Sequence, residues 1–78
     1  MWYVLDMETA KIIGKNLKLA RKYRGLTQKE VATLLRMTQQ QYSRFENGVF
    51  ELNYAQILFL CELYEITPNE LFDISSPN

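Results

Sequence analysis

Apolar residues recur along this chain at the three- and four-residue intervals of short amphipathic helices. Between positions 8 and 23, one helical face carries Ile13, Leu17 and Ala20. Between positions 53 and 64, the same intervals separate Ile57, Leu60, Cys61 and Tyr64. Apart from a short apolar stretch at residues 2–5, no pattern typical of a strand is present. The chain is therefore predicted to be all-α, a compact bundle of five helices.

Four of the five predicted helices begin with a capping box. In such a box an N-cap side chain and the side chain three positions on each bond the other residue's backbone N–H. The two most informative boxes are opened by Thr27 and Thr38 and closed by Glu30 and Gln41. Two further boxes pair Asn53 with Gln56 and Thr67 with Glu70.

The spacing of the first two boxes predicts a specific motif. A short helix, Gln28–Leu35, is followed by a tight turn and by a second helix that ends at Asn47-Gly48. Glycine accepts the left-handed conformation that follows a helix end, and Gly25 ends the first helix of the chain in the same way. The result is a helix-turn-helix over residues 28–47, a motif that places its second helix in the major groove of DNA.

Length and composition exclude several classes of protein. The 78 residues suffice for one domain, which we place at 11–73, after an apolar leader at 1–10 and before a frayed tail at 74–78. The chain has no histidine and a single cysteine, Cys61, which argues against disulfides, metal sites and histidine-based catalysis. We expect no enzyme activity, no cofactor and no metal. No apolar run suffices to span a membrane and the leader is too short for a signal peptide, so we expect a cytoplasmic protein.

Charge is zero overall but strongly segregated along the chain. All nine basic residues lie between positions 11 and 44, where Glu30 is the only acid, so nine minus one gives this window a charge of +8. The other eight acids lie outside the window, with no basic residue among them. A compact domain with this distribution has one face suited to phosphates.

The second helix of the predicted motif has two different faces. Tyr42 and Phe45 face the core, whereas the opposite face carries Gln40, Ser43, Arg44 and Asn47, with Gln39 beside them in the first turn. A glutamine amide matches the adenine edge in the major groove, and arginine matches guanine. Gln28 is a candidate phosphate ligand, because the start of a helix has free N–H groups and a positive dipole end.

These residues resemble the Cro/repressor (Xre-like) helix-turn-helix family between about Ile13 and Phe72. The resemblance is carried by Gly25-Leu26-Thr27-Gln28 and by Tyr42-Ser43-Arg44-Phe45-Glu46-Asn47-Gly48. The combination of Thr38-Gln39-Gln40 with Glu46-Asn47-Gly48 is especially similar to lambdoid phage repressors. It implies a lambda-repressor-like domain in which bases are read by Gln39, Gln40 and Arg44 and phosphates are held by Gln28 and Asn47. It also implies an ion pair between Arg21 and Glu46. The sequence alone suits Arg21 equally well to bind phosphate, and one residue can serve both roles.

The sequence thus predicts a transcriptional regulator that binds double-stranded DNA sequence-specifically. We expect a repressor that acts as a homodimer on a palindromic operator, with half-sites ~34 Å apart. The residues predicted to read bases are Thr38, Gln39, Gln40, Ser43 and Arg44. The residues predicted to hold phosphates are Thr27, Gln28, Lys29, Arg36, Asn47 and Arg21.

Three departures from the family pattern leave other partners open. Arg36 stands where the family usually has glycine, and a left-handed residue there costs about 1 kcal/mol. The loop that follows the motif carries the acid Glu51, and its Val49 and Phe50 are either buried or in contact with a protein partner. Trp2–Leu5 covers the domain's own core or a dimer partner. Two alternatives follow: an antitoxin-type autoregulator with a toxin partner, and a protein-interaction module that has lost DNA binding.

Overall fold

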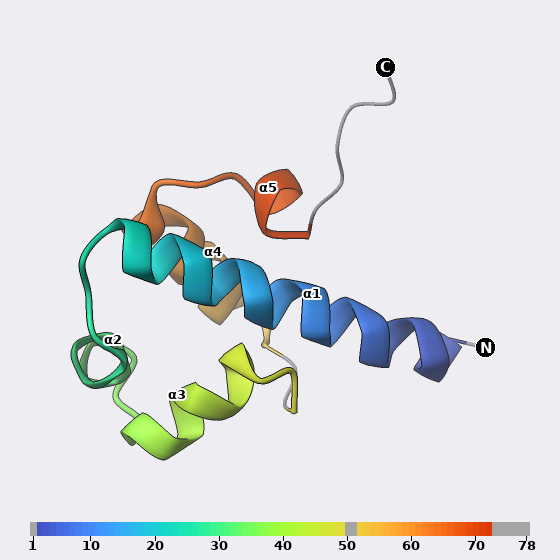
Figure 1. The fold of residues 1–78 in the computed structure, drawn as a ribbon, viewed down its shortest axis with the longest axis horizontal. Coiled ribbons are helices and arrows are strands. Elements are labelled where there is room, and N and C mark those ends of the chain that lie inside the picture. The colour runs from blue at the N-terminus through green and yellow to red at the C-terminus, as the bar shows by residue number, and fades with distance from the viewer. Residues whose placement is uncertain (1, 50–51, 73–78) are drawn as a thin grey trace.

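Five helices make up the part of the chain that the computed structural model describes, residues 2–49 and 52–72, with side chains from residue 8 onward. In chain order they are α1 (Trp2–Tyr23), α2 (Gln28–Leu34), α3 (Gln39–Glu46), α4 (Tyr54–Tyr64) and α5 (Pro68–Phe72). Within these residues there is no strand, so the predicted all-α, five-helix fold is confirmed. The long α1 crosses the molecule, with α2 and α3 on one side of it and α5 on the other, as Figure 1 shows.

The predicted capping boxes are present at the starts of four helices. At α2 the backbone N–H of Glu30 donates to Thr27 Oγ1 (3.0 Å), and Glu30 Oε1 accepts from the backbone N–H of Thr27 (2.8 Å). The boxes at α3, α4 and α5 have the same reciprocal bonds. Each box satisfies N–H groups that the first turn of a helix leaves without a partner.

The ends of α1 to α4 share one conformation. Each helix is followed by a residue with positive φ: Gly25 (73°), Arg36 (59°), Gly48 (72°) and Glu65 (57°). At each end the next N–H reaches back across the turn, as from Met37 to Ala32 O (2.9 Å) and from Ile66 to Cys61 O (2.9 Å). This is the Schellman arrangement, which satisfies the last carbonyls of a helix. The sequence left open whether the turn at Arg36 is strained or differently shaped, and the structure shows the left-handed conformation there. Glu65 is a second case that was not predicted.

The start of α1 differs from the prediction. The helix was expected from about Glu8 and begins at Trp2, so the backbone of residues 2–5 is helical, and the short strand considered there is absent. Aromatic and β-branched residues favour strands, which explains the ambiguity of this stretch. Neither glycine nor proline occurs between Trp2 and Ile13, so the sequence has no signal that would interrupt the helix.

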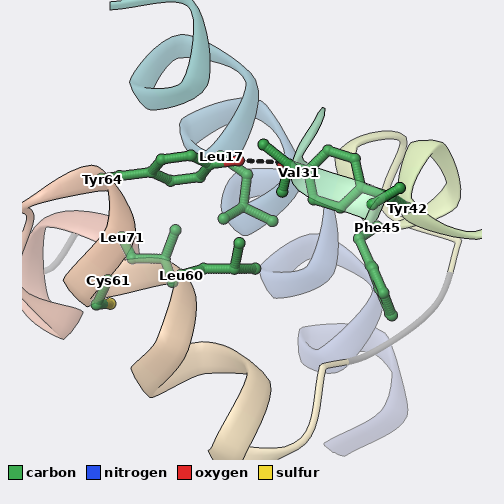
Figure 2. Packing of buried hydrophobic residues seen from close by; sticks show 9 residues of the cluster. Leu17, Val31, Tyr42, Phe45, Leu60, Cys61, Tyr64 and Leu71 are labelled. Carbon is green, nitrogen blue, oxygen red and sulfur yellow. Dashed lines mark hydrogen bonds between the residues drawn. The ribbon is translucent and has the colours of Figure 1, made fainter. Parts of the chain in front are cut away.

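The core lies where all five helices meet. Its buried members are Leu17, Val31, Ala32, Tyr42, Phe45, Leu60, Cys61, Tyr64 and Leu71. Figure 2 shows Tyr42 and Tyr64 reaching toward each other from α3 and α4, with a hydrogen bond of 2.6 Å between their hydroxyls. Two polar groups in an apolar core thereby satisfy each other. The core assignments of Tyr42, Phe45 and Cys61 are confirmed.

Polar side chains of α1 and of the turn that follows it hold the ends of α5 and α4. Asn16 Nδ2 donates to Leu71 O at the end of α5 (2.9 Å), and Arg24 Nε donates to Tyr64 O at the end of α4 (2.9 Å). Gly14 allows α1 to approach α3, because a Cβ on it would lie only 2.4 Å from Glu46 O. The helix α1 is therefore the element against which the helix-turn-helix is positioned.

Candidate nucleic-acid interface

The starts of α2 and α3 come together around a polar hollow. This hollow has a volume of about 570 Å³ and is lined by Gln28, Gln39, Gln40, Ser43 and Arg44. The turn that contains Arg36 connects the two helices, and Val31, Ala32, Tyr42 and Phe45 fix them on the core. Four residues predicted to read bases thus share one concave surface with Gln28, which was predicted to hold phosphate.

A buried ion pair anchors the end of α3. Arg21 Nε donates to Glu46 Oε2 (2.7 Å), Arg21 Nη2 donates to Glu46 Oε1 (3.2 Å), and Arg21 Nη1 donates to Leu26 O (2.9 Å). The residues are 8% and 6% exposed. The structure therefore contains the pair that the resemblance implied. Because the guanidinium is buried and used in these bonds, we assign Arg21 to the ion pair and not to phosphate binding.

The ionisation of this pair follows from its contacts. The hydrogen bond with Glu46 raises the pKa of Arg21, against the opposing effect of burial. For Glu46, burial would raise the pKa, but hydrogen bonds from Arg21, Tyr42 and Gln28 together bring it below its ordinary value. Glu46 is thus a carboxylate at neutral pH, and a carboxylate accepts hydrogen bonds without donating any.

Two glutamine amides continue this network to the surface. Gln28 Nε2 donates to Glu46 Oε1 (3.0 Å), and Gln39 Nε2 donates to Gln28 Oε1 (3.4 Å). The network runs from the half-buried first residue of α2 to the exposed first residue of α3. A residue predicted to hold phosphate is therefore in direct contact with a residue predicted to read bases.

The same network extends into the core through tyrosine. Tyr42 bonds Tyr64, and its hydroxyl also helps to lower the pKa of Glu46. Burial raises the pKa of Tyr64 to about 12, and burial together with the bond to Tyr64 raises that of Tyr42. Both phenols therefore remain protonated at neutral pH and available as donors.

The other predicted site residues surround the hollow. The hydroxyls of Thr27 and Thr38 accept hydrogen bonds within their capping boxes, and both residues are exposed. Lys29 and Arg36 are exposed on α2 and in the turn. Asn47 follows α3 and donates from Nδ2 to Ser43 Oγ (3.3 Å), which ties it to the edge of the hollow. The base and phosphate roles of all these residues remain predictions.

Of the residues that the sequence suggested for contact with a protein partner, the structure describes the side chain of Val49. Val49 is 64% exposed, so it does not belong to the core. Phe50, Glu51 and the side chains of Trp2–Leu5 lie outside the described residues, as does the tail at 74–78.

Sequence reasoning missed the bond between Gln28 and Glu46 and the hydroxyl bond between Tyr42 and Tyr64. The partners are 18 and 22 residues apart, and no local pattern in the sequence signals either bond.

The described residues hold neither a membrane-spanning helix nor a cluster of metal ligands. None of the helices there has the length and apolar character needed to cross a membrane. Among the same residues, no group of three or more histidine, cysteine, aspartate or glutamate side chains is arranged to hold a metal ion. Cys61 is buried, and burial raises the pKa of its thiol, as expected of a cysteine that packs as a small apolar residue.

The chain is similar to a known protein family and to a characterised protein. A family model described as a helix-turn-helix domain matches residues 14–74. The chain is 34% identical over 56 residues to "Antitoxin PezA" of Streptococcus pneumoniae serotype 4. This match covers 72% of the chain and 35% of the relative, so the chain spans about a third of that protein's length. No solved structure matches the chain.

Proposed function

Because the chain belongs to the helix-turn-helix domain family, we propose that it binds double-stranded DNA sequence-specifically and regulates transcription. The observation that carries this proposal is the polar hollow at the start of α3. It gathers side chains that match base edges, and it follows directly on the turn between α2 and α3. The segregated charge supports the same function, because every basic residue lies between positions 11 and 44.

In this proposal α3 lies in the major groove. Gln39, Gln40, Ser43 and Arg44 contact base edges from the hollow, and Thr38 contacts them at its rim. Phosphates on either side bind the exposed starts of α2 and α3 and the side chains that surround them, namely Thr27, Gln28, Lys29, Arg36 and Asn47. Lys11, Lys15, Lys18 and Lys22 are exposed along α1 and add positive charge. Phosphate contacts set the register on the duplex, whereas the hollow sets the sequence preference.

We further propose a repressor that acts as a homodimer on a palindromic operator. A single recognition helix offers few base contacts, so two copies are needed for tight, specific binding. Two-fold symmetry then requires two half-sites about 34 Å apart. A bound dimer of this kind blocks access to the promoter that it covers.

Selection from a randomised duplex library, followed by titration of the winning sequence at several salt concentrations, tests the proposal. We expect an enriched palindrome, a binding stoichiometry of two chains per site and an affinity that falls steeply with salt. Absence of any enriched sequence, with equally weak binding to all duplexes, would contradict sequence-specific DNA binding. It would favour the interaction module, which predicts a protein partner and no operator.

A second candidate function is antitoxin activity with autoregulation. The observation in its favour is the similarity to an antitoxin, which covers the helix-turn-helix region of this chain. Under this proposal the operator lies upstream of the chain's own gene, and a toxin encoded beside that gene is the protein partner. Both functions use α3 for DNA, so they differ in the partner and not in the DNA site.

Co-expression separates the two candidates. The neighbouring gene is expressed with and without this chain, and growth is measured in each case. Rescue of growth by the parent chain and by its Gln40→Ala variant supports an antitoxin, because neutralisation would not depend on the DNA-reading face. A neighbour that never arrests growth contradicts the antitoxin proposal and leaves the regulator proposal intact.

A further inference from the structure

The buried carboxylate of Glu46 lies at the origin of a one-way chain of hydrogen bonds that ends at a residue of the polar hollow. We propose that Glu46 is a positioning residue that sets, through Gln28, which end of the Gln39 amide faces the DNA. This inference rests on the proposed function, because its consequence is the base preferred at the position that Gln39 reads. Glu46 itself is 6% exposed and touches no base in this scheme.

The first step is the contact between Glu46 and Gln28. Both oxygens of the carboxylate accept from Arg21, and Oε1 also accepts from Gln28 Nε2 at 3.0 Å. A carboxylate offers no proton, so the Gln28 amide can bond it only through its nitrogen. The side-chain oxygen of Gln28 must then point the other way, out of the core.

The second step is the contact between Gln28 and Gln39. The outward oxygen of Gln28 accepts from Gln39 Nε2 at 3.4 Å. Because a carbonyl oxygen only accepts, this contact excludes the opposite orientation of the Gln39 amide. An amide on the surface is ordinarily free to turn over, since its oxygen and nitrogen have nearly the same shape. Here the Glu46 carboxylate, acting through Gln28, keeps the Gln39 amide from turning over.

The consequence concerns the pattern that Gln39 presents in the hollow. Its oxygen is left as an acceptor, and one N–H of its nitrogen remains as a donor. An acceptor next to a donor matches the N6 amino group and N7 of adenine, whereas guanine presents two acceptors there. We therefore expect adenine at the base pair read by Gln39, with a preference of about tenfold or more over guanine.

Two substitutions should reverse the order of donors and acceptors. In Glu46→Gln the new amide keeps its oxygen on Arg21 Nε, the shorter contact at 2.7 Å, because a nitrogen there would meet a donor at closer range. Its nitrogen then turns toward Gln28 and gives up the longer contact with Arg21 Nη2 at 3.2 Å. Gln28 then turns over, and Gln39 follows. In Gln28→Lys the ammonium stays on Glu46 and offers only donors to Gln39, so Gln39 turns its oxygen inward. In both variants the nitrogen of Gln39 faces the DNA. We therefore expect the adenine preference to be lost and to shift toward guanine, which presents two acceptors.

Arg21→Lys is the matched control. It loosens the ion pair but leaves the negative charge on Glu46, so the order of the Gln28 and Gln39 amides should persist. The adenine preference should therefore persist in Arg21→Lys, whatever stability is lost. Tyr42→Phe serves as a second control of the same kind, because it removes another contact of Glu46 without removing its charge.

The experiment measures base preference at every operator position for the parent and these four variants, with urea denaturation of each. In parallel, NMR contacts of the side-chain amide protons of Gln28 and Gln39 report the amide order without DNA. Loss of preference at one base pair in Glu46→Gln and Gln28→Lys, with preference retained in both controls, is the expected result. If Glu46→Gln does not fold, Gln28→Lys decides, because it leaves the ion pair intact.

Two results would overturn the inference. One is an even loss of affinity at all positions in Gln28→Lys, with the amide contacts unchanged. The other is equal loss of the adenine preference in Arg21→Lys, which would show that general loosening is the cause. Failure of the parent chain to select any sequence would instead contradict the proposed function, and the NMR contacts would then still show whether the amides are ordered by Glu46.

Discussion

The turn between α2 and α3 and the turn between α4 and α5 have nearly the same backbone. Each contains a left-handed residue, then an apolar residue, then a threonine N-cap: Arg36-Met37-Thr38 in the first and Glu65-Ile66-Thr67 in the second. The φ angles of Arg36 and Glu65 are 59° and 57°, and a capping box follows in both turns. The difference between the two units must therefore lie in what the helices carry.

The helix after each turn has a different composition and role. α3 has eight residues, buries Tyr42 and Phe45, and shows polar side chains to the hollow. α5 has five residues, buries Leu71, and belongs to the acidic part of the chain, where no basic residue follows Arg44. Identical turn geometry thus accompanies a candidate DNA surface in one unit and core packing in the other. A helix-turn-helix backbone alone does not specify DNA binding.

The two units are also anchored by different forces. α3 is held by the buried ion pair of Arg21 and Glu46, whereas α5 is held by burial of Leu71 and by the bond from Asn16. At the surface that we propose reads DNA, a buried charge pair adds to apolar burial, whereas the other unit has no buried charge among the contacts described for it. The following predictions test this contrast, beginning with the largest expected effect.

Arg21→Met should lower the free energy of unfolding by roughly 3–5 kcal/mol, because it leaves the Glu46 carboxylate buried without its partner. Urea denaturation at neutral pH measures the loss. In a domain of this size such a loss is a large part of total stability. A loss below about 1 kcal/mol would contradict the view that the ion pair anchors α3.

The pH dependence of this loss is its control. The folded-state pKa of Glu46 lies below the unfolded value, so its contribution is fully present above the unfolded pKa, about 4.3, and is lost as pH falls through the folded pKa. The stability gap between the parent and Arg21→Met should therefore be widest near neutral pH and shrink as pH falls toward and below about 4. The shrinkage begins above the unfolded pKa, because burial without Arg21 raises the pKa of Glu46 in the variant. A gap that does not change with pH would mean that Arg21 acts through packing alone.

Leu71→Ala should lower the free energy of unfolding by about 2–5 kcal/mol, the range for a fully buried leucine. Leu71 is 0% exposed and packs against the core that α4 and α1 share. In contrast to Arg21→Met, this loss should persist at low pH, since no charge is involved. Denaturation curves of both variants at pH 7 and pH 3 distinguish the two kinds of anchoring.

Local parts of the structure could be predicted from the sequence, and the reason is that they are local. The capping boxes at Thr27 and Thr38 depend on neighbours within a few positions. The buried faces of α3 and α4 followed from helical periodicity. The start of α1 did not follow, because Trp2–Leu5 has the composition of a strand.

Contacts between distant residues were beyond such reasoning. Gln28 was assigned to phosphate from its place at a helix start, but its bond to Glu46 requires the packed positions of α1, α2 and α3. The pair of Arg21 and Glu46 came from the family resemblance and not from spacing. The close approach at Gly14 likewise depends on how α1 crosses the end of α3. These are the contacts that shape the hollow.

Gln40→Ala and Asn69→Ala form a matched pair, because both residues lie two positions after a threonine N-cap and both are exposed. Gln40→Ala should weaken binding to the selected operator by about 1–3 kcal/mol and relax the preference at one base pair. Asn69→Ala should leave DNA binding unchanged. Fluorescence anisotropy with selected and scrambled duplexes measures both. If the two substitutions weakened DNA binding equally, α3 could not be the helix that reads the DNA sequence.

Substituting glycine for the left-handed residue of each turn, in Arg36→Gly and Glu65→Gly, allows a direct comparison of the two turns. We expect these variants to have the smallest effects on stability. Each substitution places glycine at a left-handed position, which relieves the strain of about 1 kcal/mol that other residues have there. The gain in stability is reduced because glycine has more conformational freedom in the unfolded chain. We expect a gain of roughly 0.5 kcal/mol or less from each variant. The ion pair of Glu65 with Arg24 is mostly exposed and contributes little to this balance. Thermal denaturation measures both gains.

DNA binding should separate these two variants where stability does not. Arg36→Gly removes a cation next to the start of α3, so the affinity should fall and the salt dependence should decrease by about one counterion. Glu65→Gly should change neither, because its turn belongs to the unit that packs the core. Titrations of both variants at three salt concentrations provide the comparison. If Arg36→Gly keeps the parent's salt dependence, Arg36 is a turn residue like Glu65, and the phosphate contacts must come from the helix starts and the lysines of α1.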